Sequence, residues 1–251
     1  MPNYVTNIVT VKENIEEFKK SCLDENFENL DFNKIIAEPQ DLEIVSGSMS
    51  YGYKSDLELK IQMFLKTFYS EELTQEEFFN KVTEELKTKT NMKFPLEKNE
   101  QEHYECLVKG YYNLQKYGYK DWYDWRVENW GTKWNAKECY VSEDNNGLHI
   151  EFLSAWSTPT CIWDKLAEKF DFTVAFADED IGCNFGVIIA KDKSVDYNTF
   201  EDLSQASKMY TALLIRYGAD NDNVDADAEE YELGLPVERQ EELTEMIREY
   251  V

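Results

Sequence analysis

Tryptophan, asparagine and arginine side chains gather in one segment, residues 118–138, and form the first group that could do chemistry. This segment reads GYKDWYDWRVENWGTKWNAKE and contains four of the six tryptophans of the chain. Large aromatic side chains bury most of their area in ordinary cores, so one interpretation is a core in which Arg126 stacks among the rings. The other interpretation is an aromatic binding face for a base or another flat ligand. The residues of this face would be Trp122, Trp125, Arg126, Asn129, Trp130, Trp134, Asn135 and Trp156.

Acidic side chains gather at two further places. Residues 178–180 read Asp-Glu-Asp, and residues 219–251 contain twelve Asp and Glu against two Arg. Clusters of this kind are usually solvated, and they also suit a partner with a basic surface. The residues that we expect to face such a partner are Asp178, Glu179, Asp180, Asp220, Asp222, Asp225, Asp227, Glu229 and Glu230.

Metal binding is the alternative use of these carboxylates. Residues 221–232 have a spacing similar to that of an EF-hand loop, but Asn221 replaces the first aspartate and Ala226 stands where glycine makes the turn. In residues 178–180, successive side chains of an extended strand point to opposite faces and do not converge on one ion. We therefore expect no metal site, and we expect no cofactor because the chain contains no glycine-rich phosphate loop.

Local sequence patterns do not mark a catalytic nucleophile. The two histidines, His103 and His149, stand outside any ligand motif, and the five cysteines are widely spaced and never form C-x-x-C. Distant residues can still assemble a catalytic unit in a fold, because such partners need not be adjacent in sequence. The expected class is nevertheless a binding protein that is not an enzyme.

The charge of the chain restricts its partners. It has 26 Lys and Arg against 51 Asp and Glu, which gives a formal net charge of −25. A chain of this charge repels nucleic acid and anionic membranes, so we expect it to bind neither directly. Its acidity suits solubility, a basic protein partner, or mimicry of a nucleic acid in the cationic groove of a partner. No apolar run approaches a membrane span, and the start of the chain lacks a signal peptide, so a cytoplasmic location is expected.

The elements that position these residues change character along the chain. Residues 4–11 and 31–37 are predicted strands, with a helix between them that begins after Asn14. Helices are then predicted from Ser55, from Thr74 in a capping box with Glu77, and from about residue 99.

The second half of the chain alternates strands and helices. Asp121 is predicted to cap a helix that ends at Gly131, and the Asn-Gly turn of residues 144–147 predicts a hairpin. Thr158-Pro159 predicts the start of a helix, after which strands are expected over residues 173–177 and 185–190. An acidic loop should then lead to a last helix that begins at Pro236.

Four segments resemble one known family. They read MPNYVTN, DWYDWRVENWGTKWNA, FLSAWSTP and FADEDIGCNFG, and they are similar to the YubB or Api-like proteins of phages and plasmids. The resemblance covers residues 2–45 and 118–190, and it implies a ferredoxin-like domain in a protein of a mobile element. It implies no catalytic residue.

These observations define the expected architecture. The fold class is α+β, with a ferredoxin-like antiparallel sheet, a helical insertion and an acidic helical tail. Residues 1–50 and 118–195 would form the ferredoxin-like domain, residues 51–117 the insertion, and residues 196–251 the C-terminal helices with the acidic loop.

The expected function is that of an accessory protein that binds a host protein with a basic surface. A nuclease complex of a defence system would be such a partner, inhibited in the manner of a DNA mimic. The alternatives are a nucleotide-binding or small-ligand-binding protein, or an enzyme, that uses the Trp-rich region, and a structural or regulatory protein without inhibitory action. The sequence indicates no oligomeric state.

Overall fold

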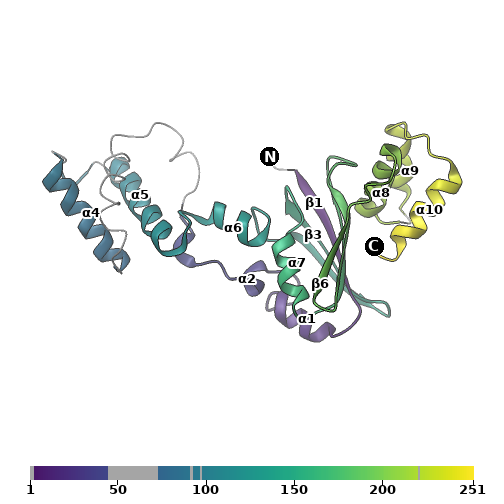
Figure 1. Cartoon of the computed structure of the whole chain (residues 1–251), viewed down its shortest axis with the longest axis horizontal. Coiled ribbons are helices and arrows are strands. Elements are labelled where there is room, and N and C mark those ends of the chain that lie inside the picture. Colours follow the sequence, from purple (N-terminus) through teal and green to yellow (C-terminus); the bar gives the residue numbers. More distant parts are fainter. Residues whose placement is uncertain (1–2, 45–72, 91–92, 97, 220) are drawn as a thin grey trace. The chain divides into compact units, whose positions relative to one another are not determined.

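The chain divides into two compact units in a computed structural model. The first unit comprises residues 1–37 and 126–251, and the second comprises residues 38–125 (Figure 1). The structure describes residues 3–44, 73–90, 93–96, 98–219 and 221–251. The helix predicted from Ser55 and the candidate residue Asp220 lie outside the described residues.

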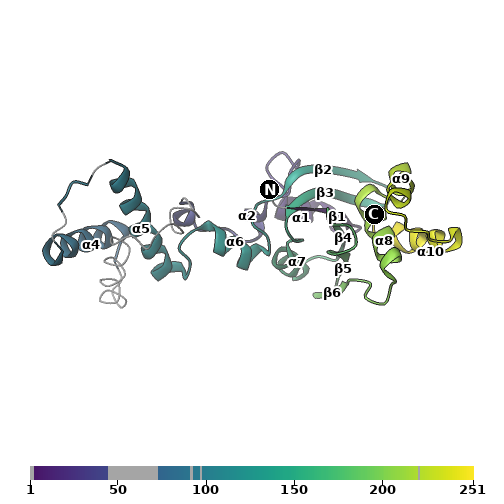
Figure 2. The same ribbon diagram turned by 90° about the horizontal axis from the view of Figure 1, so that it is seen from above.

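The first unit is built on a six-stranded antiparallel sheet with the order β2-β3-β1-β4-β5-β6 (Figure 2). The strands are β1 (Tyr4–Val11), β2 (Lys137–Asp144), β3 (Gly147–Ala155), β4 (Phe172–Asp178), β5 (Phe185–Lys191) and β6 (Ser194–Asn198). The central strand β1 pairs with β3 and β4, so Val9 lies between Ile150 and Val174. Helix α1 (Ile15–Cys22) follows β1, and helix α7 (Thr160–Ala167) joins β3 to β4. The sheet and its helices confirm the predicted α+β fold class.

The hairpin between β2 and β3 forms at the predicted Asn-Gly turn. The Asp144 carboxylate accepts hydrogen bonds from the backbone N–H groups of Asn146, at 2.7 Å, and Gly147, at 3.2 Å. These bonds stabilise the ionised carboxylate, and the pKa of Asp144 is lowered chiefly by the N–H group of Asn146. Gly147 has a φ of 140°, and a Cβ atom there would lie 2.4 Å from the Val11 carbonyl oxygen. Only glycine fits this position.

The strand predicted over residues 31–37 is wrong, because Phe32–Ile35 form the short helix α2. The Asp31 carboxylate caps this helix by accepting a hydrogen bond from the Asn33 N–H group at 3.0 Å. The Phe32 N–H group donates to the Asn135 side-chain oxygen at 2.9 Å. The segment was predicted to be a strand that Pro39 ends, but these two hydrogen bonds give the first turn of a helix the partners that it needs.

One face of the sheet is covered by α1 and α7, and aromatic rings fill the layer between the sheet and these helices. The Phe18 ring meets the Phe170 and Phe172 rings edge-on, with centroids 5.2 and 6.0 Å apart. The Trp163 ring lies 6.0 Å from the Phe152 ring, and its N–H group donates to the Thr158 hydroxyl at 2.7 Å. Trp163 is fully buried, so this hydrogen bond satisfies its polar atom within the core.

The opposite face is covered by helix α8 (Gln205–Tyr217), and helices α9 (Asp222–Glu230) and α10 (Val237–Arg248) pack on α8 (Figures 1 and 2). A buried cluster joins β4 and β5 to these helices through Ala175, Val187, Leu213, Val224 and Ile247. The predicted acidic loop is wrong, because these residues form α9. The sequence of α9 does not repeat apolar residues with the period of a helix, because the helix buries a single residue, Val224.

The second unit is helical in the residues that the structure describes between 73 and 125. Helix α4 (Gln75–Lys89) begins with the predicted capping box of Thr74 and Glu77, and α5 (Lys98–Tyr117) packs against it. The Thr83 hydroxyl and the Tyr104 hydroxyl lie 2.7 Å apart between the two helices. Among the described residues, no helix combines the length and the apolar character that crossing a membrane requires.

Candidate functional site

The tryptophans of the predicted aromatic face are divided between the two units. Trp130, at the end of helix α6 (Trp122–Trp130), is fully buried and donates from its ring N–H group to the Ile36 carbonyl at 2.9 Å. Its ring contacts the Phe32 ring edge-on at 5.7 Å, and the Arg126 guanidinium lies 5.0 Å from its centroid. Trp130 is thus a core residue with Arg126 stacked on it, which agrees with the first interpretation.

The remaining predicted residues have separate environments. Trp125 is buried and belongs, with Trp122, to the second unit, where the Trp122 ring contacts the Tyr123 ring at 5.7 Å. Asn135 donates to the Asp31 carboxylate at 2.8 Å and accepts from the Phe32 N–H group, so it joins two segments of the fold and is not available to a ligand. Asn129 is half-buried on α6.

Trp134 and Trp156 do lie together, in a row of alternating rings and ammonium groups. The Lys133 ammonium lies 4.8 Å from the Trp156 ring centroid and 4.5 Å from that of Trp134. The Lys137 ammonium lies 4.0 Å from the Trp134 centroid and 5.5 Å from that of Tyr4. We call the five residues Trp156, Lys133, Trp134, Lys137 and Tyr4 the aromatic–lysine ladder. The distances are those of cation–π contacts.

The ladder is assembled from three parts of the sheet. Tyr4 begins β1, Trp156 follows β3, and Lys137 begins β2, so antiparallel pairing brings the three to the same end of these neighbouring strands. The sequence prediction missed Tyr4, Lys133 and Lys137. A usable signal was present, because two lysines flank Trp134 at close spacing, and basic residues interleaved with aromatic ones indicate a binding surface.

Trp156 is an exposed ring on a fixed backbone. Its side chain is 43% exposed and its backbone has a φ of 70°, which is unusual for a bulky residue. Its N–H group donates to the Asn3 carbonyl at 2.9 Å, and its carbonyl accepts from the Asn184 side chain at 3.1 Å. These bonds on both sides hold the backbone in the left-handed region.

In the acidic turn of residues 178–180, one carboxylate is buried and two are exposed. Asp178 is buried, and its carboxylate accepts hydrogen bonds from the Asp180 N–H group at 2.8 Å and from the Asn184 side chain at 3.3 Å. The prediction that Asp178 faces a partner is therefore wrong. Glu179 and Asp180 are exposed, and Glu179 accepts from the Tyr4 N–H group at 3.2 Å. The Asp180 carboxylate raises the pKa of the exposed Cys183 thiol, which is the opposite of activation as a nucleophile.

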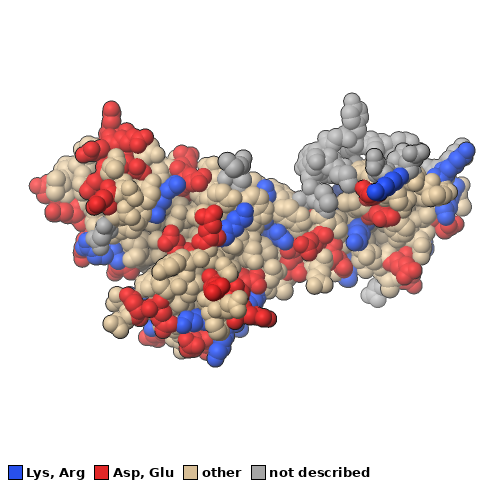
Figure 3. All heavy atoms as spheres, turned by 180° about the vertical axis from the view of Figure 1, so that it is seen from behind, with Lys and Arg blue, Asp and Glu red and all other residues tan. Residues whose placement is uncertain are grey.

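Exposed carboxylates dominate α9 and α10 (Figure 3). We call the following exposed residues the acidic surface: Asp222, Asp225, Glu229, Glu230, Glu238, Glu241, Glu242, Glu245 and Glu249. The two arginines of this region pair within α10, Arg239 with Glu242 at 2.7 Å and Arg248 with Glu245 at 2.6 Å. Asp227, which was predicted to face a partner, is instead half-buried and accepts from the Tyr217 hydroxyl at 2.8 Å.

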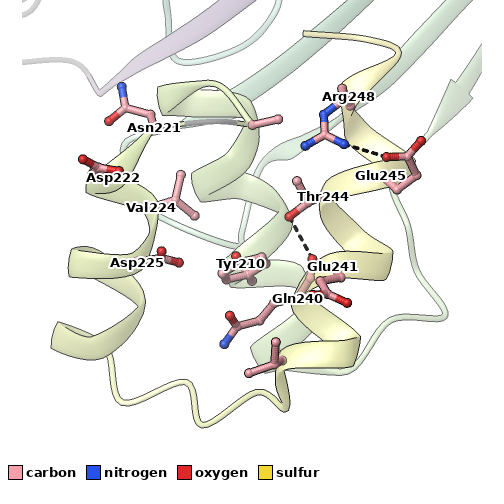
Figure 4. A pocket seen from close by; sticks show the side chains of 12 residues that line it. Tyr210, Asn221, Asp222, Val224, Asp225, Gln240, Glu241, Thr244, Glu245 and Arg248 are labelled. Carbon is pink, nitrogen blue, oxygen red and sulfur yellow. Dashed lines mark hydrogen bonds and ion pairs between the residues drawn. The ribbon is translucent and has the colours of Figure 1, made fainter.

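A hollow of about 560 Å³ lies within the acidic surface (Figure 4). It is lined by Asp222 and Asp225 of α9, by Glu241, Glu245 and Arg248 of α10, and by Tyr210 of α8. Throughout the part of the chain that the structure describes, no three His, Cys, Asp or Glu side chains are placed to hold one metal ion. The carboxylates around the hollow are thus spread over a surface.

Topology defines the class of the first unit. The order β1, α1, β2, β3, α7, β4, with the sheet order β2-β3-β1-β4, is that of a ferredoxin-like domain, to which β5 and β6 add a further hairpin.

A match to one protein family agrees with this class. Residues 129–223 match the family model described as the ferredoxin-like domain in Api92-like protein. This part of the chain is therefore similar to the ferredoxin-like domain of Api92-like proteins, and the resemblance to Api-like proteins is confirmed. The match includes four of the five ladder residues and excludes α10. No curated protein matches the chain.

A solved structure is also similar to the chain. It is the crystal structure of a protein api92 from Yersinia pseudotuberculosis, with a TM-score of 0.38 and 11% sequence identity. The similarity covers 78% of this chain and 98% of the api92 chain.

Proposed function

We propose that the protein acts by binding a protein partner through the acidic surface of α9 and α10. We infer that the partner carries a basic surface that otherwise binds nucleic acid, so that the bound protein takes the place of the nucleic acid. A nuclease complex of a host defence system is a partner of this kind, and binding would inhibit it.

The observation that carries this proposal is the excess of exposed carboxylates over cations on α9 and α10. Nine exposed carboxylates form the surface, and the two arginines of the same region already pair with two of them. Concentrated charge of one sign attracts an oppositely charged partner and accelerates its association.

The position of two acids supports a role outside folding. Glu229 and Glu230 end α9, whose last turn has no basic residue. The C-terminal end of a helix carries a partial negative charge, so acids there oppose helix stability, whereas Asp222 and Asp225 at the first turn favour it. The helix dipole disfavours Glu229 and Glu230 at this end, and an interaction with a cationic partner supplies a reason for them.

The hollow of the acidic surface suits a basic side chain of the partner. Its lining contains four carboxylates from both helices and one cation, Arg248, which pairs with Glu245, and the aromatic ring of Tyr210 forms part of the same wall. A lysine or arginine that enters this hollow would pair with a carboxylate and place its aliphatic stem against the Tyr210 ring and Val224.

A charge-reversal experiment tests the proposal. The variant Glu229→Lys, Glu230→Lys, Glu241→Lys changes three exposed residues of the acidic surface. Immobilised wild-type protein should capture a basic protein from a lysate of the source cells, identified by mass spectrometry, and the variant should lose it. Added duplex DNA should displace the captured protein, because both would occupy the same basic surface.

The control variant carries the same change of charge elsewhere. Glu13, Glu17 and Glu25 are exposed outside the acidic surface, and their replacement by lysine should leave capture intact. Equal capture by wild type and both variants, or capture that persists in excess DNA, would contradict the proposal. In those cases the acidity would serve only to keep the protein in solution.

A cytoplasmic location belongs to the same proposal. None of the five cysteines, all within the described residues, forms a disulfide, which fits a reducing compartment that also contains nucleic-acid-binding host proteins.

A further inference from the structure

The aromatic–lysine ladder lies apart from the acidic surface, because its residues come from the starts of β1 and β2 and the end of β3. We propose that it binds a nucleoside phosphate. The base would stack on the exposed ring of Trp156, and the phosphate would bind the ammonium groups of Lys133 and Lys137. This proposal does not depend on the protein partner inferred above.

Trp156 provides the stacking surface. Its ring is 43% exposed, although a tryptophan of a folded domain gains most by burying its area. Its φ of 70° costs conformational energy, and strain of this kind is typical of functional sites. The hydrogen bonds to the Asn3 carbonyl and from the Asn184 side chain fix the backbone that carries the ring before any ligand arrives. A ligand would thus lose little of its binding energy in ordering the site.

The two lysines provide the charge beside this ring. The Lys133 ammonium lies 4.8 Å from the Trp156 centroid, so a positive charge borders the stacking surface. The Lys137 ammonium is held near the Trp134 and Tyr4 rings, and it also donates to the Tyr4 hydroxyl at 3.4 Å. Contact with an aromatic face does not itself neutralise an ammonium group, because the face carries no net charge.

The acids near the ladder limit the size of the ligand. Glu138 follows Lys137 and is exposed, and Glu179 accepts a hydrogen bond from the Tyr4 N–H group at 3.2 Å. These carboxylates would repel the successive phosphates of a long strand, as would the net charge of −25. Two lysines and one open ring match one base and one phosphate, so the structure favours a single nucleotide over a nucleic acid strand.

Calorimetric titration of the whole chain tests the proposal with defined probes. AMP, GMP, CMP and UMP are the nucleotides, and adenosine and ribose 5-phosphate are the two halves of AMP. We expect AMP to bind more tightly than either half, because it alone uses both the ring and the lysines. A single-stranded oligonucleotide should bind no more tightly than the mononucleotide. Tighter binding of the oligonucleotide would overturn the choice of ligand.

Variants then assign the binding to the ladder. Trp156→Gly removes the stacking ring and suits a backbone with φ of 70°, so the variant should remain folded. It should bind AMP at least about 10-fold more weakly, given the strength of stacking between bases and aromatic rings. The double variant Lys133→Met, Lys137→Met keeps most of each aliphatic stem and should lose the preference for AMP over adenosine.

Matched controls come from the same unit. Tyr231, with a ring that is 46% exposed, and Lys12, which is also exposed, lie outside the ladder. Tyr231→Ala and Lys12→Met should bind AMP as the wild type does. The proposal is wrong if the wild type binds none of the four nucleotides at about 1 mM, a concentration that detects weak ligands. It is also wrong if Trp156→Gly, shown by its melting curve to be folded, binds AMP with unchanged affinity.

Discussion

The aromatic–lysine ladder and the acidic surface hold their charges in opposite ways. In the ladder, each ammonium group lies within 4.0 to 5.5 Å of two ring centroids. On the acidic surface, nine carboxylates are exposed and two of them have arginine partners. A few charges fixed among rings suit a small ligand of defined geometry. Many charges in solvent suit a large partner, because long-range attraction does not require each carboxylate to be in a fixed position.

The two regions also differ in their effect on the stability of the fold. Cation–π contacts stabilise the folded chain, so the ladder can support structure and binding together. Like charges on a helix repel one another, so the acidic surface lowers the free energy of unfolding. Stability measurements can therefore separate the two regions without knowledge of any ligand.

The largest expected effect concerns the core beside the ladder. Trp130→Ala should lower the free energy of unfolding by about 3–5 kcal/mol, because it leaves a cavity and an unpaired Ile36 carbonyl. Trp156→Ala should cost about 1 kcal/mol or less, since its ring is exposed and loses one lysine contact. Denaturant unfolding of both variants makes the comparison. Equal losses would mean that Trp156 belongs to the core and would remove it as a stacking surface.

Local signals explain which elements could be predicted from the sequence. The capping box of Thr74 and Glu77, the Asn-Gly turn and the Thr158-Pro159 helix start each depend on residues within a few positions of one another. Such short-range chemistry acts wherever the segment lies in the fold. The resemblance to Api-like proteins supplied the ferredoxin-like class that the strand order then showed.

Long-range partners explain what could not be predicted. Phe32–Ile35 become a helix through a hydrogen bond to Asn135, more than 100 residues away. Helix α9 buries only Val224, so no apolar period marks it as a helix. The ladder joins Tyr4 to Trp134 and Trp156 through sheet pairing, and the sequence alone does not give a register between strands so distant along the chain.

The next effect tests whether the ladder stabilises the fold. Lys137→Met removes an ammonium that lies 4.0 Å from the Trp134 centroid and should lower the free energy of unfolding by about 0.5–1 kcal/mol. Lys12→Met removes an exposed lysine outside the ladder and should change stability little. Thermal unfolding at matched salt compares the two. Identical melting temperatures would show that the ladder contacts add nothing to the fold.

A gain in stability is expected on the acidic surface. Glu229→Gln and Glu230→Gln remove negative charge from the C-terminal end of α9, where the helix dipole disfavours it, and each should raise stability by about 0.3 kcal/mol. Asp222→Asn at the first turn should have the opposite effect, because a negative charge there favours the helix. A loss of stability in the glutamine variants would mean that these acids serve the fold, and the argument for a partner would lose its support.

The smallest expected effect is on the pH dependence of stability, and it tests whether Asp227, unlike the exposed acids around it, has a structural role. Its carboxylate accepts a hydrogen bond from the Tyr217 hydroxyl at 2.8 Å, and this bond raises the pKa of Tyr217. A raised pKa in the folded state stabilises the fold fully below the ordinary tyrosine pKa of about 10, and this contribution is lost as the pH rises above it. Tyr217→Phe lacks the titrating group, so its stability should fall less steeply above pH 10 than that of the wild type. Tyr231→Phe, which changes an exposed ring at the end of α9, is the control and should follow the wild-type curve. Parallel curves for wild type and Tyr217→Phe would show that Asp227 is as loosely held as the other carboxylates, and the division of the acids into structural and partner-facing groups would then be lost.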